Sequence, residues 1–242
     1  MVFEPPQPSG RGPSSKPARI ALILDDFGAG LSHVDRCLAL PNEISFAVIP
    51  HLADSARVAR DAHARGFDVF LHQPMEPHNY PKENPGRYGI YIGQSPEEVA
   101  AILTDNIASI GVPIVGVNNH MGSRATESKE IMTAFFDAFP RRLIFLDSRT
   151  SSQSVAYDIA RAHGITALRN NIFLDAVQEK SAVETAFDQL VKMSKAKGFA
   201  VGIGHVQSLP TLEVLEARLP RLAEFGVSLV RLSDLARAPS NP

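Results

Sequence analysis

Several residue types that mark particular protein classes are scarce or absent in this chain of 242 residues. Tryptophan is absent, and an aromatic content of 7% leaves few rings for stacking against a ligand. The single cysteine, Cys37, excludes an internal disulfide and says nothing about the compartment. No apolar run approaches the ~18 residues of a membrane-spanning helix. No basic run accompanies the net charge of −2, which argues against a nucleic-acid partner, because such proteins need a clustered cationic surface.

The apolar residues suffice for one substantial core, since they make up 44% of the chain. We expect a Pro/Ser-rich disordered lead-in or linker at 1–18, one folded unit at 19–236 and a C-terminal tail at 237–242. The lead-in lacks the apolar stretch of a signal peptide, and its composition suits the trimmed remnant of a longer chain. We therefore expect any export signal or anchor to lie upstream of it.

Strand and helix patterns alternate through the folded unit. Short apolar runs predict about eight strands, at 19–24, 44–49, 67–71, 113–117, 142–146, 165–168, 199–203 and 227–231. Helical patterns lie between them, at 31–40, 54–65, 96–110, 127–139, 154–163, 179–197 and 210–225. This alternation predicts a parallel sheet, either open and doubly wound or closed as a barrel. We favour a deformed (β/α) barrel of seven or eight mostly parallel strands, because polar residues follow nearly every strand.

Two adjacent carboxylates, Asp25 and Asp26, come directly after the first predicted strand. They repel each other, and ionised carboxylates are costly to bury without a metal, a proton or a hydrogen-bond donor. One of them could cap the following helix, but capping does not explain the pair. The pair therefore marks a candidate functional site.

Polar side chains follow the other predicted strands as well. In strand order the ends carry Asp25 and Asp26, His51, His72 and Glu76, Asn118, Asn119 and His120, Asp147 and Arg149, Arg169 and Asn170, His205, and Ser233 and Asp234. These ends converge on one face of a parallel barrel, the face that holds the active site. Four histidines and two aspartates there favour a metal site. The alternative for His51, Asn118 and Asn119 is hydrogen bonding without a chemical role.

The segment 72–95 is the longest stretch without helix or strand character. Loops of this length in compact domains are usually functional or disordered. This one starts from a predicted ligand strand, and Pro74 and Pro77 would stiffen the part that carries Glu76. We expect the segment to frame a substrate groove.

Six segments in a fixed order carry a family resemblance. They are 23–28 (ILDDFG), 71–77 (LHQPMEP), 118–123 (NNHMGS), 145–150 (FLDSRT), 173–175 (FLD) and 203–205 (IGH). The chain resembles the divergent polysaccharide deacetylase family, a distant branch of the NodB-like carbohydrate esterases, over essentially all of 19–236. The resemblance implies a NodB-like barrel that removes N- or O-acetyl groups from a polysaccharide or cell-envelope glycan. It also implies one divalent metal ion, with zinc as the expected metal.

The resemblance assigns roles to four residues. The better-known deacetylases have a general base and then a metal ligand after strand one, which correspond to Asp25 and Asp26. Their second motif is His-x-x-x-His, and this chain has His72-x-x-x-Glu76, so a carboxylate replaces the second ligand. Their arginine- and proline-rich third motif is missing, and 118–122 stands in its place. Their late histidine, which protonates the leaving group, corresponds to His205.

These departures leave the third metal ligand open between His120 and Glu76, beside Asp26 and His72. Either set has the three protein ligands of an open hydrolytic site. We favour His120, because it follows a strand directly and would be held more rigidly than Glu76. Zinc suits such ligands, and iron, cobalt or manganese would also fit.

The remaining residues have supporting roles in this interpretation. Glu76, Asn119 and His51 are expected to contact substrate, with Glu76 alternatively orienting a ligand. Asp147 and Arg149 are expected to steady the catalytic arrangement, Arg149 by pairing with Asp25. The alternative is a plain salt bridge between Asp147 and Arg149. Asp175 is interpreted as the start of a turn and left out of the catalytic set.

A second function remains open: a catalytically inactive barrel that binds an envelope glycan or a protein partner. The altered second and third motifs favour it, whereas the presence of all four residues with assigned roles favours an enzyme. The expected partner is a glycan, without nucleic acid and without a membrane span in this chain, and the oligomeric state is not indicated. The expected location is periplasmic or envelope-associated.

Overall fold

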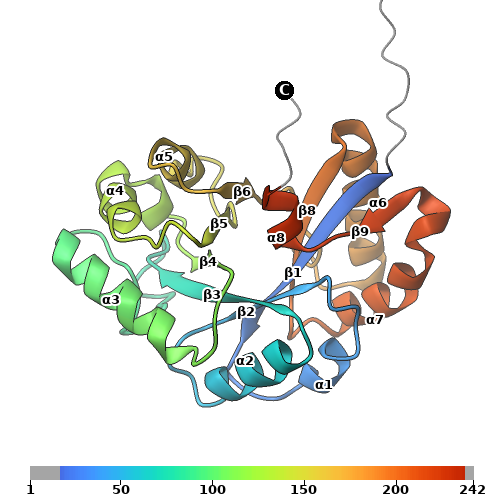
Figure 1. Ribbon diagram of the computed structural model, residues 1–242, viewed down its shortest axis with the longest axis horizontal. Helices are drawn as coiled ribbons and strands as arrows, with labels where there is room; N and C mark the ends of the chain where they lie inside the picture. Colours follow the sequence, from blue (N-terminus) through green and yellow to red (C-terminus); the bar gives the residue numbers. More distant parts are fainter. Residues whose placement is uncertain (1–16, 238–242) are drawn as a thin grey trace, which may run out of the picture.

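The computed structural model describes residues 17–237, so most of the predicted lead-in (1–18) and tail (237–242) lies outside the described residues. The strands in this range are β1 (Ala18–Phe27), β2 (Ser45–Val48), β3 (Asp68–Met75), β4 (Gly116–Met121), β5 (Ile144–Asp147), β6 (Ala167–Arg169), β7 (Ile172–Phe173), β8 (Phe199–His205) and β9 (Val227–Leu229). They form one curled sheet in the order β6-β5-β4-β3-β2-β1-β8-β7, with β9 paired to β1 (Figure 1). All paired strands are parallel.

Helices surround the sheet (Figure 1). They are α1 (Val34–Cys37), α2 (Ser55–Ala64), α3 (Pro96–Ser109), α4 (Lys129–Asp137), α5 (Ala156–Ala162), α6 (Lys180–Lys197), α7 (Leu209–Arg218) and α8 (Leu232–Arg237), with the 3-10 helices η1 (Ala125–Glu127) and η2 (Leu219–Phe225). Side chains of β1 alternate between two cores, as the pleat of a strand requires. Leu22 and Leu24 pack in the large core that contains the helices, and Ala21 and Ile23 pack in the barrel interior.

One short segment joins the two ends of the curled sheet. Residues 167–169 pair with β5, and residues 172–173 pair with β8. Between them, Asn170 N donates to Asp147 O (2.9 Å) and Asn171 N donates to Val201 O (3.0 Å). The chain therefore crosses from β5 to β8 at Asn170–Asn171, and this crossing closes the barrel without a ladder between β6 and β7 within residues 17–237.

Helix α8 fills the barrel interior from the end where the strands begin. Leu232 and Leu235 pack there with residues of β1, β2, β3, β5 and β8. Ser233 Oγ donates to Asp68 Oδ2 (2.6 Å) at the first residue of β3. The expectation that Ser233 and Asp234 lie with the other strand ends is therefore wrong. The reason is that β9 pairs with the first residues of β1 and is followed at once by α8.

The structure confirms the predicted fold class, a deformed (β/α) barrel of parallel strands. Every predicted strand has a counterpart, with shifted ends, and α3 begins at Pro96 as its sequence pattern indicates. Sequence patterns missed β7 and α8, because two and six residues are too short to show a period. No helix between residues 17 and 237 combines the length and apolar content needed to cross a bilayer.

Candidate metal centre

Unusual backbone conformations gather where strands end. Four residues have the left-handed conformation: Asp26 (φ 70°), His51 (φ 59°), Met121 (φ 53°) and Arg149 (φ 56°). Asp26 is the next-to-last residue of β1, Met121 is the last of β4, and the other two follow β2 and β5 within three residues. Non-glycine residues persist in this conformation, at a cost of about 1–3 kcal/mol, only where the surrounding structure enforces it. Such strain is typical of functional sites, and here it lies on the face that the sequence predicts to hold one.

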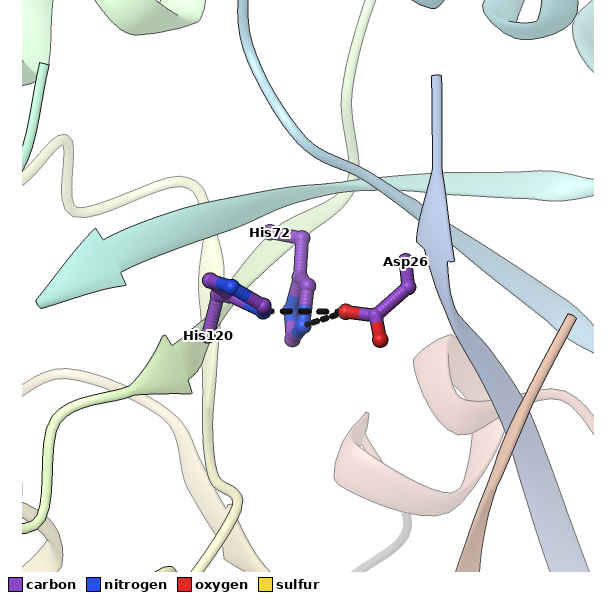
Figure 2. A group of neighbouring side chains, drawn as sticks. All are labelled: Asp26, His72 and His120. Atoms are coloured by element: carbon purple, nitrogen blue, oxygen red, sulfur yellow. Dashed lines mark ion pairs between the residues drawn. The ribbon is translucent and has the colours of Figure 1, made fainter. Parts of the chain in front are cut away.

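Three side chains from three strands meet on this face. Asp26 of β1 points toward His72 of β3 and His120 of β4 (Figure 2). Asp26 Oδ1 lies 2.9 Å from His120 Nδ1 and 3.2 Å from His72 Nε2. One ligand atom from each residue falls within 4.8 Å of the others, as a shared metal ion requires. The structure thus brings together the favoured set of the two predicted ligand sets.

The chemistry of these atoms fits a cation. Asp26 Oδ1 is buried and accepts no hydrogen bond from the described residues, although two ring nitrogens are close. Burial opposes the ionisation of Asp26, but the contacts with His120 and His72 outweigh it and hold the pKa of the carboxyl far below its usual range. Burial also opposes the charging of His72, but Asp25 and Asp26 overcome it and raise the pKa of the ring. Asp26 is therefore held ionised beside two imidazole nitrogens, and a divalent ion would take the place of the proton that the carboxylates attract to His72.

Asn118 orients His72 from the side opposite Asp26. Its amide nitrogen donates to Asp25 Oδ1 (2.9 Å) and Oδ2 (3.0 Å), so its carbonyl oxygen faces His72 Nδ1 (2.9 Å). A carbonyl oxygen only accepts, and His72 Nδ1 must therefore carry the proton. In the neutral ring this leaves the lone pair on Nε2, the nitrogen that faces Asp26. The sequence placed Asn118 at a strand end on this face but gave it no role in the site.

Replacing Asn118 by leucine is expected to weaken metal binding about 10- to 100-fold, because His72 loses the partner that fixes its tautomer and orientation. Competition with a chelator of known affinity measures the change. Asn106→Leu is the matched control, because Asn106 is an equally buried amide that bonds to Gln73 and Tyr88 instead. Equal losses in both variants, or no loss in Asn118→Leu, would contradict the orienting role.

Asp25 adjoins this cluster, but the metal would not need it as a ligand. The side chain is buried, with an exposed fraction of 1%. Its Oδ2 lies 3.6 Å from His72 Nε2. Burial raises the pKa of the carboxyl, and the charges of His72 and His205 and the hydrogen bond from Asn118 offset this only in part. Asp25 therefore has the raised proton affinity that suits a general base.

His205 pairs with Asp175, a residue that the sequence interpretation left out. Asp25 and His205 are register partners on β1 and β8. His205 Nδ1 lies 2.7 Å from Asp175 Oδ1, while Asp175 Oδ2 accepts from His205 N (2.8 Å) and Thr211 Oγ1 (2.9 Å). Burial lowers the proton affinity of the ring, but Asp175 and the more distant Asp25 and Asp26 outweigh it and raise the pKa of His205 to about 9. The segment 173–175 in the family resemblance was the signal for Asp175.

Glu76 lies outside the cluster. Its Oε1 pairs with Arg124 (2.8 Å) and its Oε2 accepts from Ile92 N (2.6 Å). One carboxylate oxygen thus binds a residue of the long loop after β3, and the other binds a residue of the segment after β4, so Glu76 links the two segments. Glu76 therefore anchors this loop, and its metal or substrate contact stays a prediction that the geometry does not favour.

Asp147 and Arg149 also have other partners than expected. Asp147 is buried, and its two oxygens accept from Arg149 N (2.9 Å) and Ser154 Oγ (2.8 Å). The Arg149 guanidinium donates to Ser152 O (3.2 Å). Within residues 17–237, Arg149 forms an ion pair with neither Asp25 nor Asp147. Asn118 takes the place beside Asp25 that was expected for Arg149.

His51 and Asn119, the other two residues predicted to contact substrate, interact with other residues of the protein. His51 Nε2 lies 3.0 Å from Asp105 Oδ2 of α3, and its ring stacks on Tyr88 with centroids 3.7 Å apart. Asn119 accepts from Ser148 N (2.9 Å) and donates to Met121 O (2.7 Å). Asn119 therefore links the ends of β4 and β5, and His51 supports the long loop. Their substrate contacts remain predictions.

Comparison of the sequence with known proteins identifies the family to which this chain is similar. A model of the divergent polysaccharide deacetylase family matches residues 22–236. A protein of Haemophilus influenzae is 35% identical over 224 residues, which cover 91% of this chain and 77% of that protein.

Two solved structures share the fold at lower identity. An uncharacterized protein from Agrobacterium tumefaciens C58 has a TM-score of 0.86 at 22% identity, and the match covers 91% of this chain and 90% of the other. The polysaccharide deacetylase Bc1974 from Bacillus cereus has a TM-score of 0.54 at 16% identity, covering 92% and 95%. At these identities the two structures bear on the fold alone.

Proposed function

Because the chain belongs to the divergent polysaccharide deacetylase family, we propose that it is a metal-dependent hydrolase. Its substrate would be a polysaccharide or cell-envelope glycan from which it removes N- or O-acetyl groups. The observation that carries the proposal is the cluster of Asp26, His72 and His120, with a buried carboxylate oxygen at its centre that accepts no hydrogen bond from residues 17–237. The family whose model matches residues 22–236 is that of the divergent polysaccharide deacetylases, which supports the substrate class.

Three protein ligands leave coordination positions open, as in hydrolytic metal sites. A divalent ion held by Asp26, His72 and His120 would polarise the acetamide carbonyl and lower the pKa of water. Zinc is the expected metal for two imidazoles and one carboxylate. Asn118 would keep the lone pair of His72 Nε2 directed at the ion.

The proton steps fall to two residues on neighbouring strands. Asp25 would accept a proton from the attacking water as the water oxygen forms its bond to the carbonyl carbon. His205, held by Asp175, would give its Nε2 proton to the amine nitrogen as the C–N bond breaks. Acetic acid and a free amine leave, and the site is restored when the proton on Asp25 passes, through water, to His205. For an O-acetyl group the leaving atom is the alcohol oxygen.

The same proposal includes the glycan partner and a periplasmic or envelope location. The absence of basic runs in the sequence is consistent with a glycan in preference to a nucleic acid. Fractionation of cells that express the full-length natural protein, followed by immunodetection, tests the location. Detection in the cytoplasmic fraction alone would overturn this part of the proposal.

Elemental analysis of untagged protein is the first test. We expect about one zinc or similar ion per chain in the wild type, and none in His72→Ala and His120→Ala. Glu76→Gln should keep the ion, because Glu76 binds Arg124 and Ile92 instead. His163→Ala is the matched control, since His163 lies at the end of α5 and pairs with Asp137.

The metal-loaded proteins are then assayed for acetate release from acetylated glucosamine oligomers. Activity that disappears together with the metal supports the hydrolase. A metal lost with Glu76→Gln but kept in His120→Ala would replace His120 by Glu76 as the third ligand. No metal after adding zinc to stripped protein would leave the catalytically inactive, ligand-binding barrel as the better proposal.

A further inference from the structure

A groove of about 390 Å³ opens where the chain crosses from β5 to β8. It is lined by Arg149, Ser152, Asn170, Asn171, Ile172 and Phe173, and we name it the Arg149 groove. The ring of Phe173 lies nearly parallel to that of His205, with centroids 6.0 Å apart and planes at 13°. The groove is therefore next to the group that would protonate the leaving amine. Its lining has one cationic residue and no carboxylate.

A strained backbone conformation positions Arg149 in this groove. Its left-handed conformation (φ 56°) is enforced by the hydrogen bond from its N–H to the buried Asp147. Ser154 binds the other oxygen of Asp147, so the carboxylate is not available to the guanidinium. The exposed guanidinium contacts Ser152 O, and it forms no ion pair with any of residues 17–237. Most of its five donors are therefore free for a ligand.

The rest of the lining fits a sugar that carries an acceptor. Asn170 and Asn171 use their side-chain oxygens to accept from Ile172 N (3.1 Å) and Val201 N (2.7 Å). Their oxygens are thus engaged in closing the barrel, and the amide nitrogen of Asn171 has no hydrogen-bond partner among the described residues. Ile172 and Phe173 add an apolar surface suited to the C–H face of a sugar ring. Donors and apolar surface are present together, without an acidic group to repel an anion.

We propose that the Arg149 groove binds an anionic substituent, a carboxylate or a phosphate, on a sugar next to the acetylated one. The inference rests on the proposed function and narrows its substrate to an acidic glycan. A guanidinium fork matches both anions with two parallel hydrogen bonds. Arg149 is thereby a specificity-determining residue, and Asp147 is the residue that positions it.

Calorimetric titration of the metal-stripped full-length chain tests binding without turnover. The probes are a neutral chitin tetrasaccharide, a hyaluronan tetrasaccharide with a carboxylate on alternate sugars, and a chitin tetrasaccharide phosphorylated at O6. We expect the wild type to bind one or both anionic probes at least about tenfold more tightly than the neutral one, as a charged hydrogen bond implies. Arg149→Gln should abolish this preference, and Arg149→Lys should restore only part of it. Which anionic probe is preferred identifies the substituent.

Arg142→Gln is the control for a general effect of charge. Arg142 is an exposed arginine just before β5, at the end of that strand opposite to Arg149. The preference should survive this substitution. Equal affinity for all three probes, absence of binding, or a preference that persists in Arg149→Gln would overturn the inference.

The failure of this inference and that of the proposed function give different results. Acetate release by the metal-loaded enzyme from at least one of the three probes tests the function alone. Acetate release without an Arg149-dependent preference would contradict the role of the Arg149 groove and support the hydrolase function. An Arg149-dependent preference without acetate release from any probe would support the groove as a glycan-binding site and contradict the hydrolase function.

Discussion

Replacing Asp25 by asparagine is expected to lower turnover about 10²- to 10⁴-fold, the range that a general base contributes, while the metal stays bound. The metal should remain because its expected ligands are Asp26, His72 and His120, and Asp25 is not among them. Turnover should fall because an amide cannot accept the proton of the attacking water. Acetate release and elemental analysis on the same preparation measure both quantities.

Two comparisons keep this result interpretable. The amide nitrogen of Asn118 donates to both oxygens of Asp25, so in Asp25→Asn it would face the new side-chain amide nitrogen, which is also a donor. Asp25→Ser avoids this conflict. Asp26→Asn is the contrasting variant, because it should lose metal and turnover together. Full turnover in Asp25→Asn and in Asp25→Ser would remove Asp25 from the catalytic set. Metal loss in both would indicate that Asp25 is a ligand.

Replacing Asp175 by asparagine is expected to lower turnover by about a hundredfold or more, because the proton donor loses both its orientation and part of its proton affinity. Burial disfavours the charged ring of His205, and the hydrogen bond and charge of Asp175 do most to overcome it and raise its pKa to about 9. Without that carboxylate the pKa should fall toward the ordinary value of about 6.5. The alkaline limb of the turnover profile should therefore move to lower pH.

The stability of the protein should change with pH in the corresponding direction. A histidine whose pKa is raised by folding stabilises the folded state fully below its unfolded pKa of about 6.5, and this contribution is lost as pH rises through about 9. The wild type should thus lose thermal stability between these values, and Asp175→Asn should lose less. An NMR titration of His205 in metal-free protein measures the pKa directly. Thr211→Val is the milder control, since it removes one hydrogen bond to Asp175 and keeps the charge.

An unchanged His205 pKa in Asp175→Asn would show that other groups raise it. Unchanged turnover together with a lowered pKa would show that His205 is not the proton donor. The two outcomes differ, so the electrostatic pairing and its catalytic use can fail separately.

Local sequence patterns were sufficient to predict the barrel. Apolar runs, their punctuation by glycine and proline, and the alternation of strands with helices are properties of neighbouring residues, and they predicted eight of the nine described strands. The polar residues in the C-terminal halves of β1, β3 and β4 were identified for the same reason. What escaped was short or depended on distant pairing: β7 has two residues, and α8 folds back against the start of β3.

The amino-acid sequence by itself determined which residues stand at the strand ends, and therefore which could take part in a site. Only the tertiary structure decided which of them meet. The curled sheet order β4-β3-β2-β1 brings His120 to Asp26, whereas Arg124 and Ile92 take both oxygens of Glu76. Likewise Asn118 reaches Asp25 across 93 positions of sequence, and Asp175 reaches His205 across 30. These contacts depend on the register between strands, which no local pattern of residues encodes.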